Sequence, residues 1–230
     1  MSNRSGRLGC IDGPTHSISI MAPVLASTLF LASSNAGKLR EFAEAASKHG
    51  ISVKPLPGIK TLPACIEDGR TFRENACKKA LHYCAYTSDP VFADDSGILV
   101  DALRGRPGVF SARFSGPQAT DDRNNERLLQ ELRRVEAASP APWHQARNRA
   151  AHYVCVIALV QCGRIVHVTE GRVDGIIIDD PRGTGGFGYD PYFFYPPLGK
   201  TFAELKAEEK FVVSHRGEAF RRLLDFLSER

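Results

Sequence analysis

The stretch LFLASSNAGK, residues 29–38, decides the fold class. Its first four residues are apolar and typical of a short buried strand, and the small residues after them are typical of a turn. From Lys38 onward the apolar residues take the helical spacing i, i+3, i+4 and i+7, at Leu39, Phe42, Ala43 and Ala46. A strand, a tight turn and an amphipathic helix in direct succession predict an α/β protein.

The rest of the chain continues this alternation. We expect a strand at 51–53, a helix from the capping box Thr71–Glu74 to about residue 84, and a strand at 91–93. After a helix at 120–135 and a surface loop at 137–142, the pattern predicts a β-meander at 153–160, 165–168 and 173–178. Helices at 201–209 and after Ser214 close the chain. The hairpins favour a mixed sheet flanked by helices over a purely parallel one.

Composition limits the class of protein. The 230 residues suffice for one large domain or two coupled lobes, and 43% hydrophobic with 24% charged residues exclude collagen, coiled coil and disordered chains. Lys and Arg exceed Asp and Glu by 30 − 26 = 4, which is too small an excess to indicate a nucleic-acid binder. The six cysteines show no C-x-x-C pair and no zinc-finger spacing. We therefore expect unpaired thiols, a reducing compartment and a cytoplasmic location.

The N-terminal region raises the question of a signal peptide, because residues 13–37 contain no Asp, Glu, Lys or Arg. Polar residues and Pro23 interrupt the apolar run, however, and cleavage at 32–34 would remove the first strand. The run is also too short and too polar for a membrane span. We expect residues 1–28 to form a loose tail, residues 29–230 to form the folded domain, and no membrane contact.

The turn before Lys38 is a candidate anion site. Free backbone amides at a helix N-terminus attract anions, and a lysine adds a full positive charge. The stretch resembles a shortened phosphate-binding loop, although it does not match the Walker A pattern. A tight turn with a solvent-facing lysine is the alternative.

Two pairs of neighbouring acids are candidates for a metal site. Asp94-Asp95 follows an apolar strand, and open α/β sheets place ligand-contacting residues at such strand ends. Adjacent strand residues project to opposite sides, so one of the two carboxylates would face a given site. Together with one carboxylate from Glu67-Asp68, it would suit Mg²⁺, which takes one or two carboxylates, waters and phosphate oxygens. Solvated strand-end acids and a capped helix are the alternative.

Two further segments could recognise a base or a phosphate. A glycine cluster at 183–188 leads into Phe187, Tyr189 and Asp190, which combine ring faces for stacking with a polar edge partner. Near the last helix, cationic groups gather at Lys210 and at 215–216. The alternatives are core aromatics in a glycine-rich turn and surface charges on a capped helix.

Seven motifs occur in order from about residue 29 to the C-terminus, and together they resemble the inosine/xanthosine triphosphate pyrophosphatase family. They are SSNAGK, EDGRTFRENA, ADDSGI, PGVFSARFSG, GTGGFGYDPYF, GKTFAEL and EEKFVVSHRG. The resemblance implies a two-lobed α/β homodimer with the active site in the cleft between the lobes. It further implies Mg²⁺-dependent hydrolysis of ITP, dITP and XTP to the monophosphate and pyrophosphate.

The resemblance also implies residue roles. Asp95 would be the catalytic base and, with Glu67, would hold Mg²⁺, while Asp94 supports it. The substrate would contact Ser33, Ser34, Asn35, Ala36, Gly37, Lys38 and Ser96, and its base would lie against Phe187, Gly188, Tyr189, Asp190, Lys210, His215 and Arg216. The chain departs from the family at Ser33-Ser34, where many relatives have Thr-Gly. The departure affects the phosphate loop, because serine adopts a positive φ less readily than glycine.

Two other functions stay open at this point. One is a pyrophosphatase for other nucleotides, such as modified pyrimidines, and the other is an RNA-binding module that uses the basic pocket. The small net charge and the lack of an aromatic–basic stripe weigh against RNA.

Overall fold

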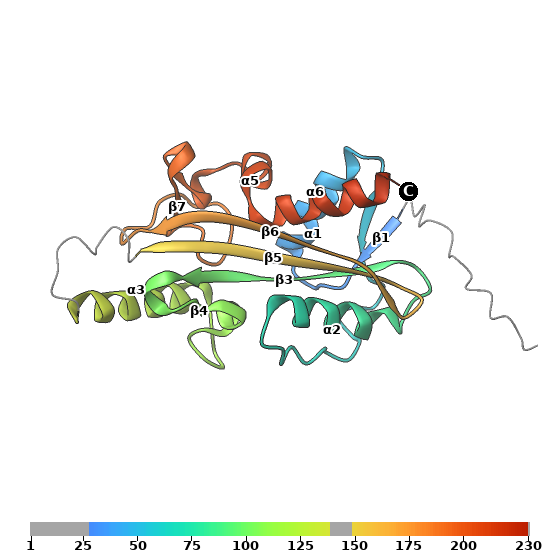
Figure 1. The fold of residues 1–230 in the computed structure, drawn as a ribbon, viewed down its shortest axis with the longest axis horizontal. Coiled ribbons are helices and arrows are strands. Elements are labelled where there is room, and N and C mark those ends of the chain that lie inside the picture. Colours follow the sequence, from blue (N-terminus) through green and yellow to red (C-terminus); the bar gives the residue numbers. More distant parts are fainter. Residues whose placement is uncertain (1–27, 139–148, 230) are drawn as a thin grey trace, which may run out of the picture.

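The computed structural model describes residues 28–138 and 149–229, and one mixed sheet organises them (Figure 1). The sheet order is β2-β1-β3-β5-β6-β7-β8, with β4 paired to β3. β1 runs parallel to β2 and β3, and the remaining pairs are antiparallel. The predicted mixed α/β sheet is confirmed. The strands are β1 Thr28–Leu31, β2 Ser52–Pro55, β3 Val91–Val100, β4 Arg106–Pro107, β5 Ala150–Gln161, β6 Arg164–Ile177, β7 Phe193–Tyr195 and β8 Lys200–Thr201.

Helices cover both faces of the long strands, with α1, α5 and α6 on one side and α2 and α3 on the other (Figure 1). The predicted cap at Thr71 is present, and side chains at Asn35, Thr71, Thr120 and Ser214 accept hydrogen bonds from the first turns of α1, α2, α3 and α6. The capping box is only half formed, because Glu74 accepts from the amide of Arg70 instead of Thr71. The helices are α1 Ala36–Ser47, α2 Phe72–Cys84, α3 Asp121–Ala137, α5 Ala207–Val213 and α6 His215–Ser228, with 3₁₀ turns η1 Asp101–Leu103, η2 Gly108–Arg113, η4 Pro196–Leu198 and η5 Phe202–Glu204.

Alternation along β3 sends neighbouring side chains into different cores. Phe92 packs with Phe42 of α1 and Phe220 of α6, and the ring centroids of Phe42 lie 5.2 Å and 4.8 Å from those of Phe92 and Phe220. Ala93 belongs to the core under α2 on the opposite face. Full burial of each large apolar side chain contributes about 1.5–3 kcal/mol, so the phenylalanine cluster firmly joins α1, β3 and α6.

Three predicted element boundaries are wrong. β3 does not end at residue 93 but continues to Val100, because each residue pairs with β5 and Asp94 and Asp95 lie opposite Ile157 and Val156. The strands expected at 165–168 and 173–178 are one continuous strand, β6, paired along β5. The helix expected at 201–209 is replaced by β8, η5 and a later helix, α5.

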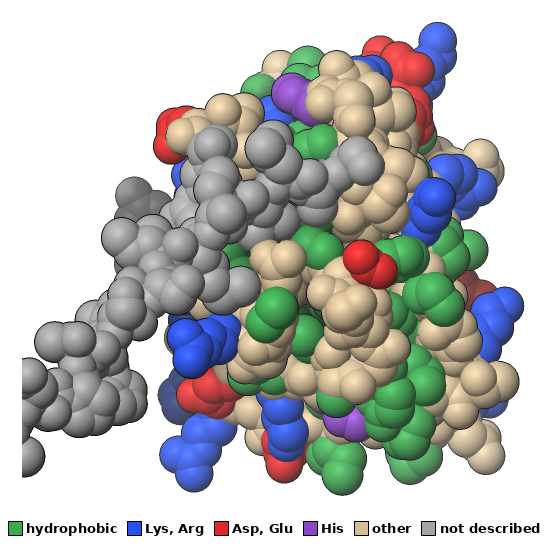
Figure 2. Space-filling view, turned by 90° about the vertical axis from the view of Figure 1, so that its right-hand side faces the viewer, with side chains coloured by type: hydrophobic (Ala, Val, Ile, Leu, Met, Phe, Trp, Pro, Cys, Tyr) green, Lys and Arg blue, Asp and Glu red, His purple; other side chains and the backbone are tan. Residues whose placement is uncertain are grey.

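Several other expectations concern the chain as a whole. Thr28 belongs to β1 and not to the expected tail, and the rest of that tail and most of the loop at 137–142 lie outside the described residues. The five described cysteines are free thiols, as expected, and Cys10 lies outside the described residues. Within the described ranges, no helix is long and apolar enough to cross a bilayer. At the end of the molecule seen in Figure 2, Lys and Arg side chains are interleaved with Asp and Glu.

Candidate active site

A cavity of about 310 Å³ collects most of the residues that the sequence singled out. Its walls come from the start of α1, the loop before α2 and α2 itself, the middle of β3, η2, the start of α3, β5, the glycine-rich loop, α5 and the start of α6. The lining residues are Asn35, Lys38, Glu67, Lys79, Asp95, Ser96, Gly97, Val109, Ser111, Ala112, Arg113, Asp121, Asn124, Tyr153, Phe187, Gly188, Tyr189, Asp190, Lys210, His215 and Arg216.

The candidate phosphate loop meets this cavity at the N-terminus of α1. Asn35 caps the helix by accepting from the Lys38 amide at 3.0 Å, and both residues line the cavity. The remaining loop residues, Ser33, Ser34, Ala36 and Gly37, lie beside the cavity and outside its lining. A Cβ on Gly37 would lie 3.4 Å from the ring of Phe187, so the loop and the glycine-rich segment are brought into contact.

Asp94 lies behind the cavity wall on the α1 and α6 face of β3. Lys38 approaches one of its carboxylate oxygens to 2.7 Å and Arg216 to 3.8 Å, so cations from opposite ends of the chain meet at this carboxylate. Burial alone would raise the pKa of Asp94, but Lys38, Arg216 and Lys79 outweigh it and lower the pKa. Asp94 therefore stays ionised although it is only 1% exposed.

Asp95 projects from the opposite face of β3, toward α2 and the cavity. Asn75 donates to one of its oxygens at 3.0 Å, and the amide of Ser96 donates to the other at 3.0 Å. Burial raises the pKa of Asp95, and the neighbouring charge of Glu67 raises it further against the lowering effect of Lys79. The two consecutive acids thus have opposite pKa shifts.

Lys79 of α2 links the candidate metal ligand Glu67 to the backbone of β3. Its ammonium lies 2.9 Å from Glu67 and donates to the backbone carbonyl of Asp94 at 3.1 Å. Burial lowers the pKa of Lys79, but Asp94 and Glu67 outweigh that effect and raise it, so it remains a cation. Neither Lys79 nor Asn75 was among the residues predicted from the sequence. Their i, i+4 spacing on the inner side of the predicted helix was the available signal.

The cationic segment at the start of α6 is anchored by a carboxylate that sequence analysis also missed. Glu41 of α1 accepts from Arg216 at 2.6 Å and from Lys210 at 3.3 Å. Burial raises the pKa of Glu41, but Arg216 and Lys210 more than compensate and lower it. Glu41 lies three residues after Lys38, a spacing that places both on one side of a helix.

The glycine-rich loop is held by polar contacts that fix its aromatic residues. Asp190 accepts from the Phe187 amide at 2.9 Å and from Lys210 at 2.7 Å. Tyr189 donates through its hydroxyl to the Ser111 carbonyl at 2.8 Å and is only 4% exposed. A Cβ on Gly186 would lie 2.1 Å from the Asp190 carboxylate, so the tight turn requires glycine there. Phe187 remains half-buried with Lys210 and Arg216 near its ring, 4.8 Å and 5.3 Å from the centroid.

His215 and Ser96 complete the wall between the loop and β3. The His215 ring stacks on Tyr153 with centroids 4.6 Å apart, and its Nδ1 is buried with no hydrogen-bond partner. Burial lowers the pKa of His215 well below its usual value, and Arg216, Lys210 and Lys38 lower it further. The ring is therefore neutral. Ser96 accepts from Arg216 at 3.3 Å.

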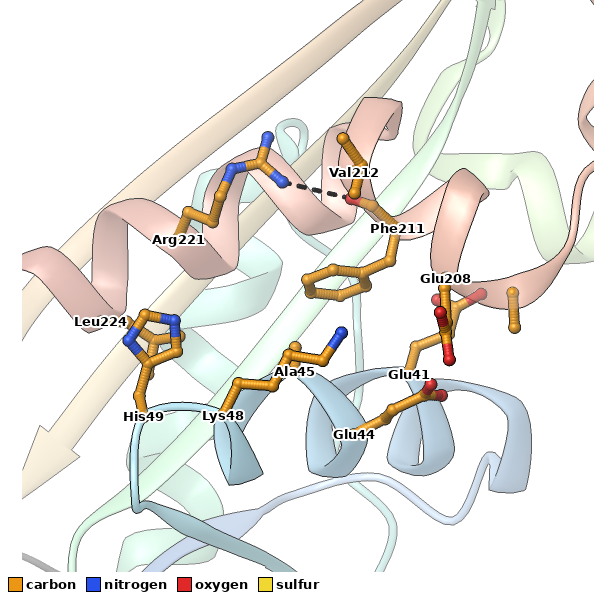
Figure 3. A pocket seen from close by; sticks show the side chains of 11 residues that line it. Glu41, Glu44, Ala45, Lys48, His49, Glu208, Phe211, Val212, Arg221 and Leu224 are labelled. Atoms are coloured by element: carbon orange, nitrogen blue, oxygen red, sulfur yellow. Dashed lines mark hydrogen bonds between the residues drawn. The ribbon is translucent and has the colours of Figure 1, made fainter.

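A second hollow, of about 160 Å³, lies between α1, α5 and α6. Figure 3 shows Glu41 and Glu208 at one end of it, with Lys48 near the ring of Phe211. Glu41 is the only one of its lining residues that bonds to residues of the larger cavity in the described part of the chain. None of the predicted site residues lines this hollow, so the chemistry belongs to the larger cavity.

The carboxylates of Glu67 and Asp95 fit a metal ion that would also be coordinated by a bound ligand. In the described ranges, no group of three or more His, Cys, Asp or Glu side chains could hold a metal without help. Glu67 and Asp95 line the same cavity and are close enough for the charge of one to raise the pKa of the other. Two such carboxylates suit Mg²⁺, because Mg²⁺ completes its shell with waters and phosphate oxygens.

Comparison with known proteins agrees with this geometry. The Ham1 family matches residues 29–226. The chain is 46% identical over 199 residues to a dITP/XTP pyrophosphatase of Geobacter sulfurreducens, covering 86% of this chain and 96% of that protein. It is 47% identical over 195 residues to one of Geobacillus kaustophilus, covering 85% and 91%. A solved HAM1 protein from Coxiella burnetii superposes with a TM-score of 0.77 at 37% identity, covering 88% of this chain and 99% of that one. The chain belongs to the Ham1 family.

Proposed function

We propose that the protein hydrolyses the non-canonical purine nucleoside triphosphates ITP, dITP and XTP to the monophosphate and pyrophosphate, with Mg²⁺ as cofactor. One observation carries the proposal: a single cavity combines Lys38 at a helix N-terminus, the Glu67 and Asp95 carboxylates, and the ring of Phe187. These groups match a phosphate, a metal and a base. The name dITP/XTP pyrophosphatase, carried by relatives over 40% identical, supports the same reaction.

Asp95 is the residue that we assign to the attacking water. Asn75 and the Ser96 amide fix its carboxylate at the wall of the cavity, where it can accept a proton from a bound water. The water oxygen bonds to the α-phosphorus while Asp95 accepts a proton. The bond from that phosphorus to the α,β-bridging oxygen breaks, and pyrophosphate departs with the bonding electrons. Bound Mg²⁺ would polarise the phosphate oxygens.

Base selection is assigned to Phe187 and the start of α6. Phe187 supplies a face for stacking, which favours purines without distinguishing them. Arg216 is a pure donor and would meet the 6-keto oxygen of hypoxanthine or xanthine. Adenine presents an amino group at that position, so two donors would face each other and the buried guanidinium would lose a partner.

The test is release of pyrophosphate from ITP, dITP, XTP, GTP and ATP, each with Mg²⁺ and with EDTA. We expect rapid release from the first three with Mg²⁺, little from ATP, and loss of turnover in EDTA. Release of orthophosphate, or equal rates with ATP, would contradict the proposal. A panel of modified pyrimidine triphosphates and an RNA gel shift test the two alternatives.

We also expect a homodimer in the cytoplasm that binds neither nucleic acid nor membrane. Size-exclusion chromatography with light scattering measures the oligomeric state directly. A monomer with full activity would contradict the homodimer.

A further inference from the structure

Five Lys and Arg side chains line the larger cavity in the part of the chain that the structure describes, and four of them are paired with carboxylates. Lys38 pairs with Asp94 and Lys79 with Glu67. Lys210 pairs with Asp190 and Glu41, and Arg216 with Glu41. The fifth cation, Arg113, forms no ion pair with any described carboxylate.

Arg113 is nevertheless held in place. Its guanidinium donates to the backbone carbonyl of Glu67 at 3.1 Å and lies 5.2 Å from the centroid of the Phe110 ring. A carbonyl oxygen and a ring face orient a guanidinium without cancelling its charge. Phe110 itself is 56% exposed, so its ring face is accessible to the guanidinium.

The backbone that presents Arg113 is anchored to the sheet. Ser111, two residues earlier, accepts from the amide of Ile98 in β3 at 2.9 Å and donates to the Gly108 carbonyl at 2.6 Å. The carbonyl of Ser111 also accepts from Tyr189. A Cβ on Gly97 would lie 2.4 Å from the Ser111 hydroxyl, so η2 packs against β3 where only glycine fits.

We infer that Arg113 is a further catalytic residue that contacts the β- and γ-phosphates and stabilises the departing pyrophosphate. The inference rests on the proposed function. Arg113 bonds to Glu67, so it lies at the carboxylate end of the cavity, where the metal and phosphates are assigned. The planar guanidinium matches phosphate oxygens with two parallel donors. When the bond to the α-phosphorus breaks, negative charge grows on the pyrophosphate, and the unpaired positive charge of Arg113 is available to it.

Measuring ligand binding directly distinguishes a phosphate-contacting role of Arg113 from a purely structural role. Isothermal titration calorimetry with magnesium pyrophosphate, and separately with IMP, would be performed on the wild type, Arg113→Gln, Arg113→Lys and Arg123→Gln. Arg123 is a matched control, because it is also exposed and donates to a backbone carbonyl, that of Gln118, outside this cavity. Thermal unfolding of each variant confirms that it is folded.

We expect Arg113→Gln to weaken pyrophosphate binding by at least about tenfold, as for loss of a hydrogen bond to a charged group, with IMP binding unchanged. Arg113→Lys should recover part of the loss, and Arg123→Gln should match the wild type. Equal weakening of IMP and pyrophosphate would show that Arg113 only supports the Glu67 loop, and it would overturn the inference, as would unchanged pyrophosphate binding. Because the readout is binding, it stands apart from turnover: a wild type that binds pyrophosphate through Arg113 but does not hydrolyse ITP would refute only the proposed function.

Discussion

Asp94 and Asp95 are consecutive residues of β3, but their side chains lie on opposite faces of the sheet and in different environments. Asp94 lies in the closed interior between α1 and α6, where Lys38 and Arg216 surround it. Asp95 lies on the α2 side and lines the cavity, where it accepts from Asn75 and the Ser96 amide. Direct ion pairs therefore compensate the first carboxylate, while neutral donors hold the second.

The difference shows how position on a strand assigns chemistry to identical side chains. The cations lower the pKa of Asp94 despite its burial, whereas burial raises the pKa of Asp95. A buried carboxylate that is ionised and held by ion pairs contributes to stability, and one with a raised pKa and a face on a cavity is suited to proton transfer. Three experiments test this division.

The largest effect is expected from Asp94→Asn. The substitution removes the negative charge between Lys38 and Arg216. It leaves Lys38 without a carboxylate partner and Arg216 with Glu41 alone, which costs about 3–5 kcal/mol in free energy of unfolding. Chemical denaturation measures the change. Asp225→Asn, at an exposed position of α6, is the matched control and should have little effect. A loss similar to that of the control would mean that Asp94 is not a structural centre of the site.

Asp95→Asn should do the reverse. It keeps the side-chain volume and one acceptor, so the free energy of unfolding should change little, while kcat for ITP should fall by at least about 100-fold, or about 2.7 kcal/mol in activation free energy. Steady-state kinetics at saturating Mg²⁺, together with the denaturation midpoint, measure both quantities. Near-normal kcat would remove Asp95 from the chemistry and end the proposed contrast between the two acids.

Sequence analysis placed the elements around this pair but misjudged the strand that carries them. Asp94-Asp95-Ser96-Gly97 reads as a strand end followed by a turn, because such residues are common in turns. In the fold, β5 supplies hydrogen bonds along all ten residues of β3, and this pairing overrides the local preference. Asp94 and Asp95 consequently lie in the middle of a strand. Their side chains project to opposite faces of the sheet, as expected, because a regular strand enforces this alternation.

Site residues that belong to a sequence motif were predictable. Residues whose role depends on contact with a segment distant in sequence were less so. Lys38, Glu67, Phe187 and Arg216 all line the cavity, as expected. Glu41 was missed because its partners are distant in sequence: Arg216 lies 175 residues away. Only the packing of α1 against α6 brings the two together, and no local pattern encodes that contact.

The smallest expected effect concerns His215, which lines the cavity near Lys38, Lys210 and Arg216 and has no described carboxylate beside it to compensate a charge of its own. Burial, Arg216, Lys210 and Lys38 lower its pKa well below the ordinary 6.5, so the folded protein keeps the ring neutral while the unfolded chain takes up a proton below that pH. The unfolded state then binds more protons, and stability falls as the pH drops below 6.5, by up to about 1.4 kcal/mol per pH unit from this group.

Denaturation of the wild type and of His215→Gln between pH 5 and 8 isolates this contribution, because the other titrating groups cancel in the difference. The difference should be constant above pH 6.5 and should shift in favour of the variant below it. A flat difference, or an imidazole NMR signal of His215 that titrates near its ordinary pKa, would mean that this part of the site accepts a further positive charge and that the cations gathered around Asp94 do not exclude one.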